Sequence, residues 1–389
     1  MKDRKIHLLN NISDFGLRDF RHGYSTTVDF SEAHGALVRS CDMHDMEFPA
    51  SLRVVARAGV GVNNIPLDRC AEQGIVVMNT PGANANGVKE LVVAALMLAS
   101  RDIVGGIEWV KAHADDPNIS ASVEKAKKAF AGNEVIGKNI GVIGLGAIGV
   151  QVANICAYLG MTVYGYDPYI SVGSAWRLKR EIRHIENLDE LFEKCDYITV
   201  HVPAIPSSRD MLNSLTFAKM KDGVKVLNFS RDFVVNEDDI AAALESGKVS
   251  RYVTDFATPK SVRMKNTVVI PHLGASTEEA EDNCALMAVR QLQDYLDNGN
   301  IKNSVNYPDI DAGKCRTESR IACLHRNVPN MLGQLTAIMG SAHINIANMV
   351  NASRDKYAYT LMDIETRISD DALDSIRAIP GMLRVRIVK

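Results

Sequence analysis

The stretch "NIGVIGLGAIG" (residues 139–149) joins a β-rich apolar run to a glycine-rich turn and the start of an apolar helix. Each of its last three glycines has a physical role. Gly144 permits a tight turn, Gly146 lets the backbone approach a pyrophosphate, and Gly149 allows the helix to pack closely against the strand. The stretch therefore predicts the strand–turn–helix unit of a dinucleotide-binding α/β domain.

The strand that follows this helix ends in an acid, Asp167. A carboxylate at that position accepts hydrogen bonds from both ribose hydroxyls and repels a 2′-phosphate, so the sequence favours NAD over NADP. Ala147 and Ile148 open the helix, and their free backbone N–H groups are expected beside the pyrophosphate. The alternative is a purely structural glycine-rich turn with a capping aspartate.

Short β-rich runs bounded by turn signals recur on both sides of this stretch, at the spacing of βα units. They predict an α/β fold with two Rossmann-like domains, each built on a doubly wound parallel sheet. A long helical pattern over 84–113 is expected to join the two domains. The expected strands are 35–40, 53–59 and 75–80 in the first domain and 196–203, 224–230, 251–257 and 267–274 in the second.

The C-terminal segment 319–389 has a different pattern, with strands and helices in the order βαββαβ. This order predicts an α+β domain with two helices on one face of an antiparallel sheet. Its expected elements are 320–325, 329–341, 344–353, 357–364, 369–378 and 382–388. The expected boundaries before it are 1–95 for a substrate-binding domain with a returning segment at 278–305, 96–277 for the nucleotide domain, and 306–318 for a linker.

The composition narrows the class of protein. The chain has 389 residues, of which 46% are hydrophobic and 23% charged, and its formal net charge is -3. These values are ordinary for a globular protein and offer no basic surface for nucleic acid. The longest apolar run, "LVVAALMLA", is about half of a membrane span, and the N-terminus lacks the apolar region of an export signal. The 7 cysteines are scattered, which argues for reduced thiols and against a metal site. We therefore expect a cytoplasmic protein without a nucleic-acid or membrane partner.

Arg231 and His272 each lie at the C-terminal end of a predicted strand. Because the carboxyl ends of parallel strands meet at one edge of a sheet, we expect these side chains in one site. A dehydrogenase acting on a 2-hydroxy acid needs a base for the hydroxyl proton and a cation for the carboxylate, and His272 and Arg231 suit these roles. The alternatives are a surface or capping histidine and a structural strand-end aspartate.

The stretches "GVIGLGAIG", "NFSR" (228–231) and "PHLGAST" (271–277) together resemble the D-isomer-specific 2-hydroxyacid dehydrogenases, from residue 1 to about residue 305. The resemblance implies NAD-dependent oxidation of a D-2-hydroxy acid, with His272 as the base and Arg231 on the substrate. It also implies that Asp255 faces the nicotinamide amide and that Pro203 lies beside the cofactor.

Two further stretches, "LVRSCDMHD" (37–45) and "ARAGVGVNNIPL" (56–67), resemble members of the family that oxidise D-3-phosphoglycerate to 3-phosphohydroxypyruvate, the first step of L-serine biosynthesis. By this resemblance, Arg39 and Ser40 hold the phosphate or carboxylate end and Arg57 adds positive charge. Backbone amides near Gly59 and Val60 contact the carboxylate. The alternatives are solvated surface arginines and another D-2-hydroxy acid as substrate, including the reduction of 2-oxoglutarate.

The stretches "CLHRNVPNMLGQL" and "HINIANM" resemble the ACT domain, a regulatory module that binds amino acids at paired interfaces. The resemblance implies an L-serine effector held by His325, Asn327 and Asn345, whose imidazole and amides suit a zwitterion. Asn330 departs from the family pattern, in which glycine is common. An ACT domain can also serve dimerisation alone, and we expect a homodimer or homotetramer.

Two departures fall near the expected active site. Lys260 stands where the family carries the glutamate that partners its catalytic histidine, and Asp232 follows Arg231 where the family carries glycine. We expect Asp232 either to compensate Lys260 electrostatically or to take over part of the orienting role. A catalytically reduced sensor of NAD and amino acids is the alternative that these departures motivate.

Overall fold

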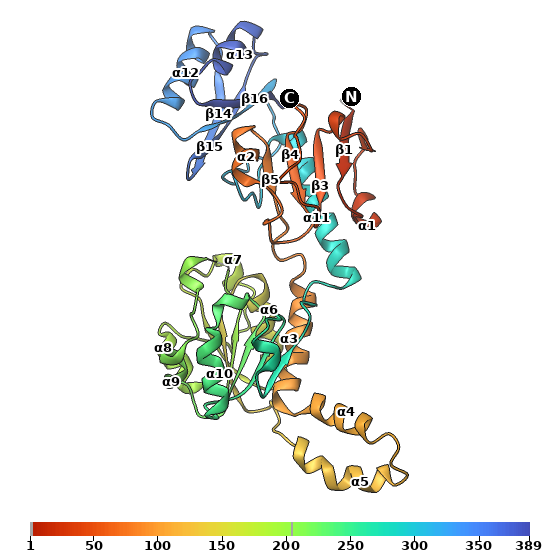
Figure 1. The fold of residues 1–389 in the computed structure, drawn as a ribbon. Coiled ribbons are helices and arrows are strands. Elements are labelled where there is room, and N and C mark those ends of the chain that lie inside the picture. Colours follow the sequence, from red (N-terminus) through yellow and green to blue (C-terminus); the bar gives the residue numbers. More distant parts are fainter. Residues whose placement is uncertain (1–2, 204) are drawn as a thin grey trace. The chain divides into compact units, whose positions relative to one another are not determined.

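The computed structural model describes residues 3–203 and 205–389 (Figure 1). The described chain forms two compact units. One unit runs up to Ala83 and resumes over Glu281–Lys389, and the other is Asn84–Ala280. No helix among the described residues is long and apolar enough to cross a membrane.

The first unit is built on a five-stranded parallel sheet with the order β2-β1-β3-β4-β5. Strands β3 and β5 carry no polar side chain and are buried throughout, as is typical of a parallel sheet covered on both sides. The covering elements include α2 (Leu67–Glu72) and α11 (Glu278–Asn298). The strands are β1 (Arg4–Leu8), β2 (Tyr24–Thr27), β3 (Gly35–Val38), β4 (Val54–Arg57) and β5 (Val76–Met78).

The second unit is built on a seven-stranded parallel sheet with the order β12-β11-β10-β9-β6-β7-β8. The strand order reverses between β6 and β9, and in doubly wound sheets ligands bind at that point, outside the carboxyl ends of the strands. The strands are β6 (Asn139–Ile143), β7 (Thr162–Tyr166), β8 (Arg183–His184), β9 (Tyr197–Val200), β10 (Val224–Asn228), β11 (Val249–Thr254) and β12 (Thr267–Val269).

Helices cover both faces of this sheet over two separate apolar clusters. On one face α3 packs against α6 over residues such as Val92 and Val152. On the other face α8 and α10 contribute residues such as Phe192 and Ile240. Helices α4 and α5 project from the rest of the unit as a hairpin (Figure 1). The helices are α3 (Ala85–Ser100), α4 (Ile103–Ala112), α5 (Ile119–Ala126), α6 (Ala147–Tyr158), α7 (Val172–Ala175), α8 (Leu188–Lys194), α9 (Ser214–Lys219) and α10 (Glu237–Glu245).

The C-terminal segment forms a four-stranded antiparallel sheet with the order β14-β15-β13-β16. Alternate residues of its strands point to opposite faces. Ile321 and Cys323 pack under the two helices, whereas Ala322 and Leu324 join the apolar core of the first unit. The elements are β13 (Ser319–Arg326), α12 (Met331–Ser341), β14 (Ile346–Arg354), β15 (Tyr357–Ile364), α13 (Asp370–Arg377) and β16 (Met382–Ile387).

The structure differs from the expected domain boundaries at the helical join. The second unit begins at Asn84, before the expected boundary at residue 96, because the whole of α3 packs on the nucleotide sheet. The single helix expected over 84–113 is two helices, since Arg101 is extended and Asp102 caps the next helix through the N–H of Gly105.

The segment expected as a linker is packed into the first unit. Tyr307 is fully buried and its hydroxyl donates to the Ala71 carbonyl oxygen at 2.7 Å. The Asn306 side chain accepts from the Val77 N–H and donates to the Ile75 carbonyl oxygen, both at 2.9 Å, which extends the hydrogen bonding of the β5 edge. The C-terminal sheet is therefore anchored to the first unit and shares its core.

Candidate active site

The glycine-rich loop after β6 has the conformation that its sequence requires. Gly144 has φ +89°, and a Cβ there would lie 2.5 Å from the His201 carbonyl oxygen. A Cβ on Gly149 would lie 1.8 Å from the Gly144 carbonyl oxygen, so only glycine lets α6 approach the loop. A Cβ on Gly146 would meet nothing within 4 Å, which leaves open space at the N-terminus of α6. Ala147 and Ile148 begin that helix, whose free N–H groups suit a pyrophosphate.

Asp167 lies beside this loop, directly after β7. One carboxylate oxygen accepts from the Leu145 N–H at 2.8 Å and the other from the Tyr169 N–H at 2.9 Å. A carboxylate has about four acceptor positions, so both oxygens retain capacity for ribose hydroxyls. Pro203 lies beyond the end of β9 and is exposed, and its carbonyl oxygen accepts from the Ser208 hydroxyl at 2.8 Å. The residues at this reversal of strand order fit an NAD molecule.

Arg231, Asp255 and His272 follow β10, β11 and β12 at the same carboxyl edge of the sheet. Arg231 is half-buried, and its guanidinium donates to the Ser230 carbonyl oxygen at 2.7 Å. His272 is exposed and adopts φ +42°, a left-handed conformation that is uncommon outside glycine. The backbone N–H of His272 donates to the Asp255 carbonyl oxygen at 3.1 Å and to the Ile270 carbonyl oxygen at 2.9 Å. These bonds stabilise the strained turn.

Asp255 has an unusual environment for a carboxyl group. It is 4% exposed, and its Oδ1 has no hydrogen-bond partner among the described residues. Burial raises the pKa of Asp255, and the charges of His272 and Arg231 oppose that rise. The three side chains therefore share one electrostatic environment. Phe256 supports the imidazole of His272, with ring centroids 5.0 Å apart.

Lys260 does not pair with Asp232. Its ammonium forms an ion pair with Asp238, at the start of α10; the Asp238 side chain is 90% exposed and that of Lys260 40%. The expected compensation between Lys260 and Asp232 is therefore wrong, because the loop after β11 directs the lysine toward the helix. Asp232 is exposed beside Arg231 and begins a short 3₁₀ turn.

The expected substrate residues lie in the first unit, after β3 and β4. The Arg39 guanidinium forms an exposed ion pair with Glu281 at 2.6 Å. The Asn10 side-chain oxygen accepts from the N–H groups of Arg39, Ser40 and Cys41 at 2.9–3.0 Å and so fixes the loop after β3. Asn10 lies in the loop after β1 and was not among the predicted site residues, because no sequence pattern predicted that strand or this contact.

The loop after β4 is held by a second residue that the sequence analysis missed, Thr80. Its hydroxyl accepts from the Gly59 N–H at 2.8 Å, and the same N–H donates to the Arg57 carbonyl oxygen at 3.0 Å. Arg57 Nε donates to the Arg39 carbonyl oxygen at 3.1 Å, which ties the two loops together. Because the Gly59 N–H is engaged within the chain, the neighbouring Val60 N–H is the better candidate to meet a carboxylate.

The three expected serine ligands do not meet within one chain. His325 is 2% exposed at the end of β13, with Nε2 2.8 Å from the Thr360 hydroxyl and Nδ1 2.9 Å from the Arg326 carbonyl oxygen. Asn327 follows it and is exposed. Asn345 lies beside Glu365, at the Ser319 end of the same sheet, about 20 Å along the strand direction from His325. These side chains share a ligand only if two copies of the domain pair.

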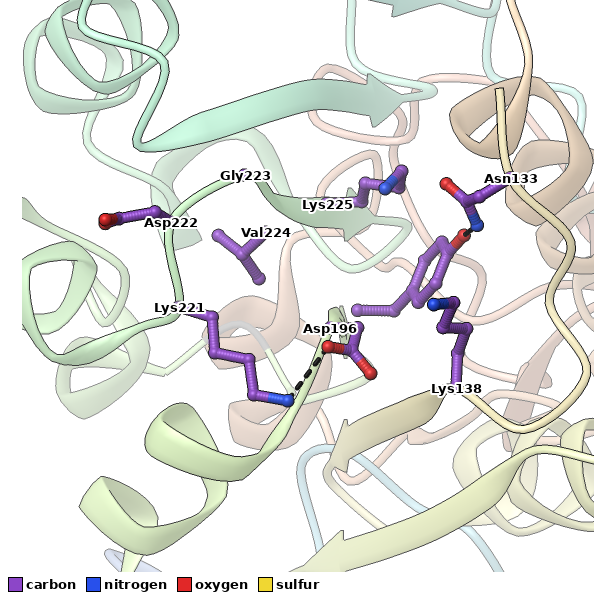
Figure 2. A pocket seen from close by; sticks show the side chains of 9 residues that line it. Asn133, Lys138, Asp196, Lys221, Asp222, Gly223, Val224 and Lys225 are labelled. Carbon is purple, nitrogen blue, oxygen red and sulfur yellow. Dashed lines mark hydrogen bonds and ion pairs between the residues drawn. The ribbon is translucent and has the colours of Figure 1, made fainter. Parts of the chain in front are cut away.

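A cavity of about 140 Å³ lies at the opposite edge of the nucleotide sheet from these residues (Figure 2). The cavity is lined by residues at the N-terminal ends of β9 and β10, among others. The glycine loop and Arg231 instead follow the C-terminal ends of their strands. Lys221 is paired there with Asp196 at 2.9 Å, and the Lys225 ammonium lies 5.0 Å from the Tyr197 ring centroid. Because ligands of parallel sheets bind at carboxyl edges, this cavity is separate from the candidate active site.

Comparison with known proteins agrees with this geometry. Residues 93–274 match the family model for the NAD-binding domain of D-isomer specific 2-hydroxyacid dehydrogenases. The chain is 31% identical over 345 residues to the D-3-phosphoglycerate dehydrogenase of Haemophilus influenzae. The aligned region covers 85% of this chain and 79% of that protein. It is 29% identical to D-3-phosphoglycerate dehydrogenase 1 of Saccharomyces cerevisiae, over 96% of this chain and 84% of that protein.

A solved structure shares the fold. The NAD+-bound 3-phosphoglycerate dehydrogenase of Entamoeba histolytica matches with a TM-score of 0.60 at 24% identity, over 78% of this chain and 99% of that one. The chain belongs to the D-isomer specific 2-hydroxyacid dehydrogenase family. The predicted α/β fold class, the NAD cofactor and the class of enzyme are confirmed.

Proposed function

We propose that this enzyme oxidises D-3-phosphoglycerate to 3-phosphohydroxypyruvate with NAD, the first step of L-serine biosynthesis. The observation that carries the proposal is the placement of Arg231, Asp255 and His272 at the carboxyl edge that also holds the glycine loop. The substrate is supported by the relatives named above, which are D-3-phosphoglycerate dehydrogenases.

In the proposed mechanism, the neutral imidazole of His272 accepts the proton of the substrate C2 hydroxyl. Arg231 binds the substrate carboxylate and the oxygen of the forming ketone through its planar guanidinium, which fixes the orientation of C2. Bound NAD supplies the acceptor for the hydride that leaves C2. Asp255 lies beside both side chains, and its Oδ1, which has no hydrogen-bond partner among the described residues, is available to the nicotinamide amide. Its negative charge also favours the imidazolium that forms at His272.

We assign the two loops of the first unit to the substrate. Arg39 and Ser40 hold the phosphate end, and Arg57 contributes positive charge. The Val60 N–H contacts the carboxylate. The Arg39–Glu281 ion pair is exposed, so exchanging Glu281 for a substrate phosphate costs little.

The first test is NADH oxidation by the full chain with 3-phosphohydroxypyruvate, compared with 2-oxoglutarate under the same conditions. Rapid oxidation with the first substrate supports the proposal. Faster oxidation with 2-oxoglutarate assigns the site to another D-2-hydroxy acid. NADH binding without turnover on either substrate contradicts the catalytic assignment and favours the sensor.

Variants separate catalysis from binding. His272→Asn is expected to lower kcat by about 10²–10⁴-fold, the range for loss of a general base. NADH affinity is expected to stay unchanged because the cofactor loop is intact. Arg231→Lys is expected to raise KM and lower kcat together, since an ammonium does not reproduce the bidentate contact. Retention of wild-type kcat in His272→Asn would remove the histidine from the mechanism.

For regulation, we propose that L-serine binds between two paired copies of the C-terminal ACT domain, with His325 and Asn327 from one copy and Asn345 from the other. Strand β14 is an edge of its sheet with a largely exposed face, so a second copy can approach it. We also propose a homodimer or homotetramer. On helix α4, the apolar residues Ile107 and Val110 are 51% and 47% exposed. These exposed apolar side chains support pairing of two chains through the second unit.

The seven free thiols suit a reducing compartment, and we place the enzyme in the cytoplasm.

A further inference from the structure

Arginines gather where the C-terminal sheet meets the five-stranded sheet of the first unit. Arg384 and Arg386 point from β16 toward Arg53, which immediately precedes β4, and Arg4 of β1 lies close by. Burial, together with the positive charges of Arg386, Arg4 and Arg384, lowers the pKa of Arg53 to about 10. Tyr295 of α11 lies among these side chains, and its ring is 4.4 Å from the Arg386 guanidinium.

Some of the arginine N–H groups donate to backbone carbonyl oxygens at the C-terminal end of α11. Arg386 Nη2 donates to the Leu296 carbonyl oxygen at 3.2 Å, and Arg4 Nη1 donates to the same oxygen. Arg4 also forms an ion pair with Asp297 at 3.3 Å. Cations are favourable at a helix C-terminus, so this end of α11 explains why two of the arginines are there.

The remaining donors have no partner in the described chain. Arg386 is 7% exposed, yet its Nε and Nη1 make no hydrogen bond, and neither does the hydroxyl of Tyr295, which is fully buried. The Arg53 side chain makes no hydrogen bond or ion pair with any described residue. By contrast, the fully buried Arg320 pairs with Asp363 through two bonds at 2.5 and 2.8 Å and also donates to backbone carbonyls. Buried arginines in this protein can therefore be fully satisfied, and Arg386 is an exception that requires an explanation.

We propose that Arg53, Arg386 and Tyr295 form a binding site for a small oxyanion of the phosphate or carboxylate class. The Nε–H and Nη2–H groups of Arg53 form one guanidinium edge that matches two oxygens of such an anion. Arg386 adds a donor from Nε or Nη1, which lie on different sides of its guanidinium, and the Tyr295 hydroxyl supplies another. The anion also relieves the repulsion between Arg53 and the arginines of β16. Arg53 and Arg384 are only half-buried, which gives the anion a route from solvent. This site is independent of the proposed catalytic function, and it ties the C-terminal sheet to the first unit.

The test uses the purified full chain, titrated with sodium phosphate or sodium malonate while sodium chloride keeps the ionic strength constant. At an anion concentration of ten times Kd, Tm is expected to rise by about 3 °C. Hydrogen exchange is expected to slow in the C-terminal turn of α11 and in β16. The two anions distinguish a phosphate site from a carboxylate site.

The variants Arg53→Met and Tyr295→Phe remove donors that hold nothing else, so both are expected to fold. Each is expected to lose at least half of the anion-dependent rise in Tm. Arg367→Met is the matched control, because Arg367 is 88% exposed on the same domain and, among the described residues, forms an ion pair with Glu318. It is expected to retain the whole rise.

Three results would overturn the proposal. The first is no change in Tm with either anion. The second is an equal rise in Tm in Arg53→Met, Tyr295→Phe and the wild type. The third is slowed hydrogen exchange only at the glycine loop after β6, which would place the anion at the cofactor site instead.

Discussion

The backbone N–H of His272 donates to the carbonyl oxygen of Asp255 at 3.1 Å, while the Asp255 carboxyl lies buried with an oxygen that has no partner. Asp255 therefore fixes the turn that carries His272 through its backbone, and its side chain adds a charge beside the imidazole. The left-handed conformation of His272, at φ +42°, is stabilised by this contact. The following experiments test the parts of the site separately.

Asp255→Asn is expected to stabilise the protein near neutral pH and to impair turnover. The folded-state pKa of Asp255 is raised by burial, so the folded state binds the proton more tightly than the unfolded state. The free energy of unfolding therefore falls as pH rises from the ordinary aspartate pKa through the raised pKa of Asp255. The Asn variant does not titrate and so does not lose this stability. Urea unfolding across this pH range is expected to show a difference between variant and wild type that grows with pH. Asp232→Asn, an exposed neighbour, is the control, and an equal pH-dependent gain in that variant would contradict the assignment.

Lys260→Ala and Asp238→Ala are expected to leave kcat and its pH profile unchanged. Their ion pair is exposed and directed toward α10, so each substitution is expected to cost less than about 1 kcal/mol of the free energy of unfolding. Steady-state kinetics across pH measure the effect on the site. A shift in the kinetic pKa upon loss of Lys260 would show that the lysine acts on His272 after all.

Asn10→Ala is expected to raise KM for the substrate by about tenfold with a smaller effect on kcat. The side chain holds three consecutive N–H groups of the Arg39–Cys41 loop, and freeing that loop weakens the grip on the phosphate end. Asn10→Asp keeps the acceptor and is expected to retain most of the affinity. If both variants have wild-type KM, the loop does not contact the substrate.

Asp167→Asn is expected to weaken NADH binding by about tenfold and to reduce the preference for NADH over NADPH. The amide keeps one acceptor for the Leu145 N–H, at 2.8 Å in the wild type, but loses the charge that repels a 2′-phosphate. Fluorescence titration with both cofactors measures the two affinities. An unchanged ratio of affinities would show that another residue selects the cofactor.

Asn345→Ala is expected to abolish the effect of L-serine while kcat without serine stays unchanged. Asn345 is exposed and its side chain makes no hydrogen bond with the described residues, so the substitution leaves the fold intact. His325→Ala is a poor test, because the imidazole is buried against Thr360 and its loss costs about 1–3 kcal/mol. Serine inhibition that persists in Asn345→Ala and in Asn327→Ala would place the effector elsewhere.

Local sequence patterns were sufficient for the nucleotide unit and for the order of elements in the C-terminal sheet. The glycines at 144 and 149 are fixed by steric limits on the backbone itself, and β-rich runs followed by helical periodicity determine a parallel sheet. Because strand ends of such a sheet meet at one edge, the grouping of Arg231 and His272 followed from their positions in the chain, whereas Asp255 was placed there by the family resemblance. The short strand β1, which has few apolar residues, carried too weak a pattern to be predicted.

Other features depend on contacts between residues far apart in the sequence, which no local pattern encodes. The 306–318 segment is polar and reads as a linker, but Tyr307 and Asn306 are held by the β5 edge. Lys260 is near Asp255 in sequence, yet its loop turns it toward Asp238. The arginines around Tyr295 come from β1, from the residue before β4 and from β16, and only the packing of the C-terminal sheet on the five-stranded sheet brings their charges together. The sequence by itself determined the chemistry available to this protein, while the tertiary structure decided which of its charges are neighbours.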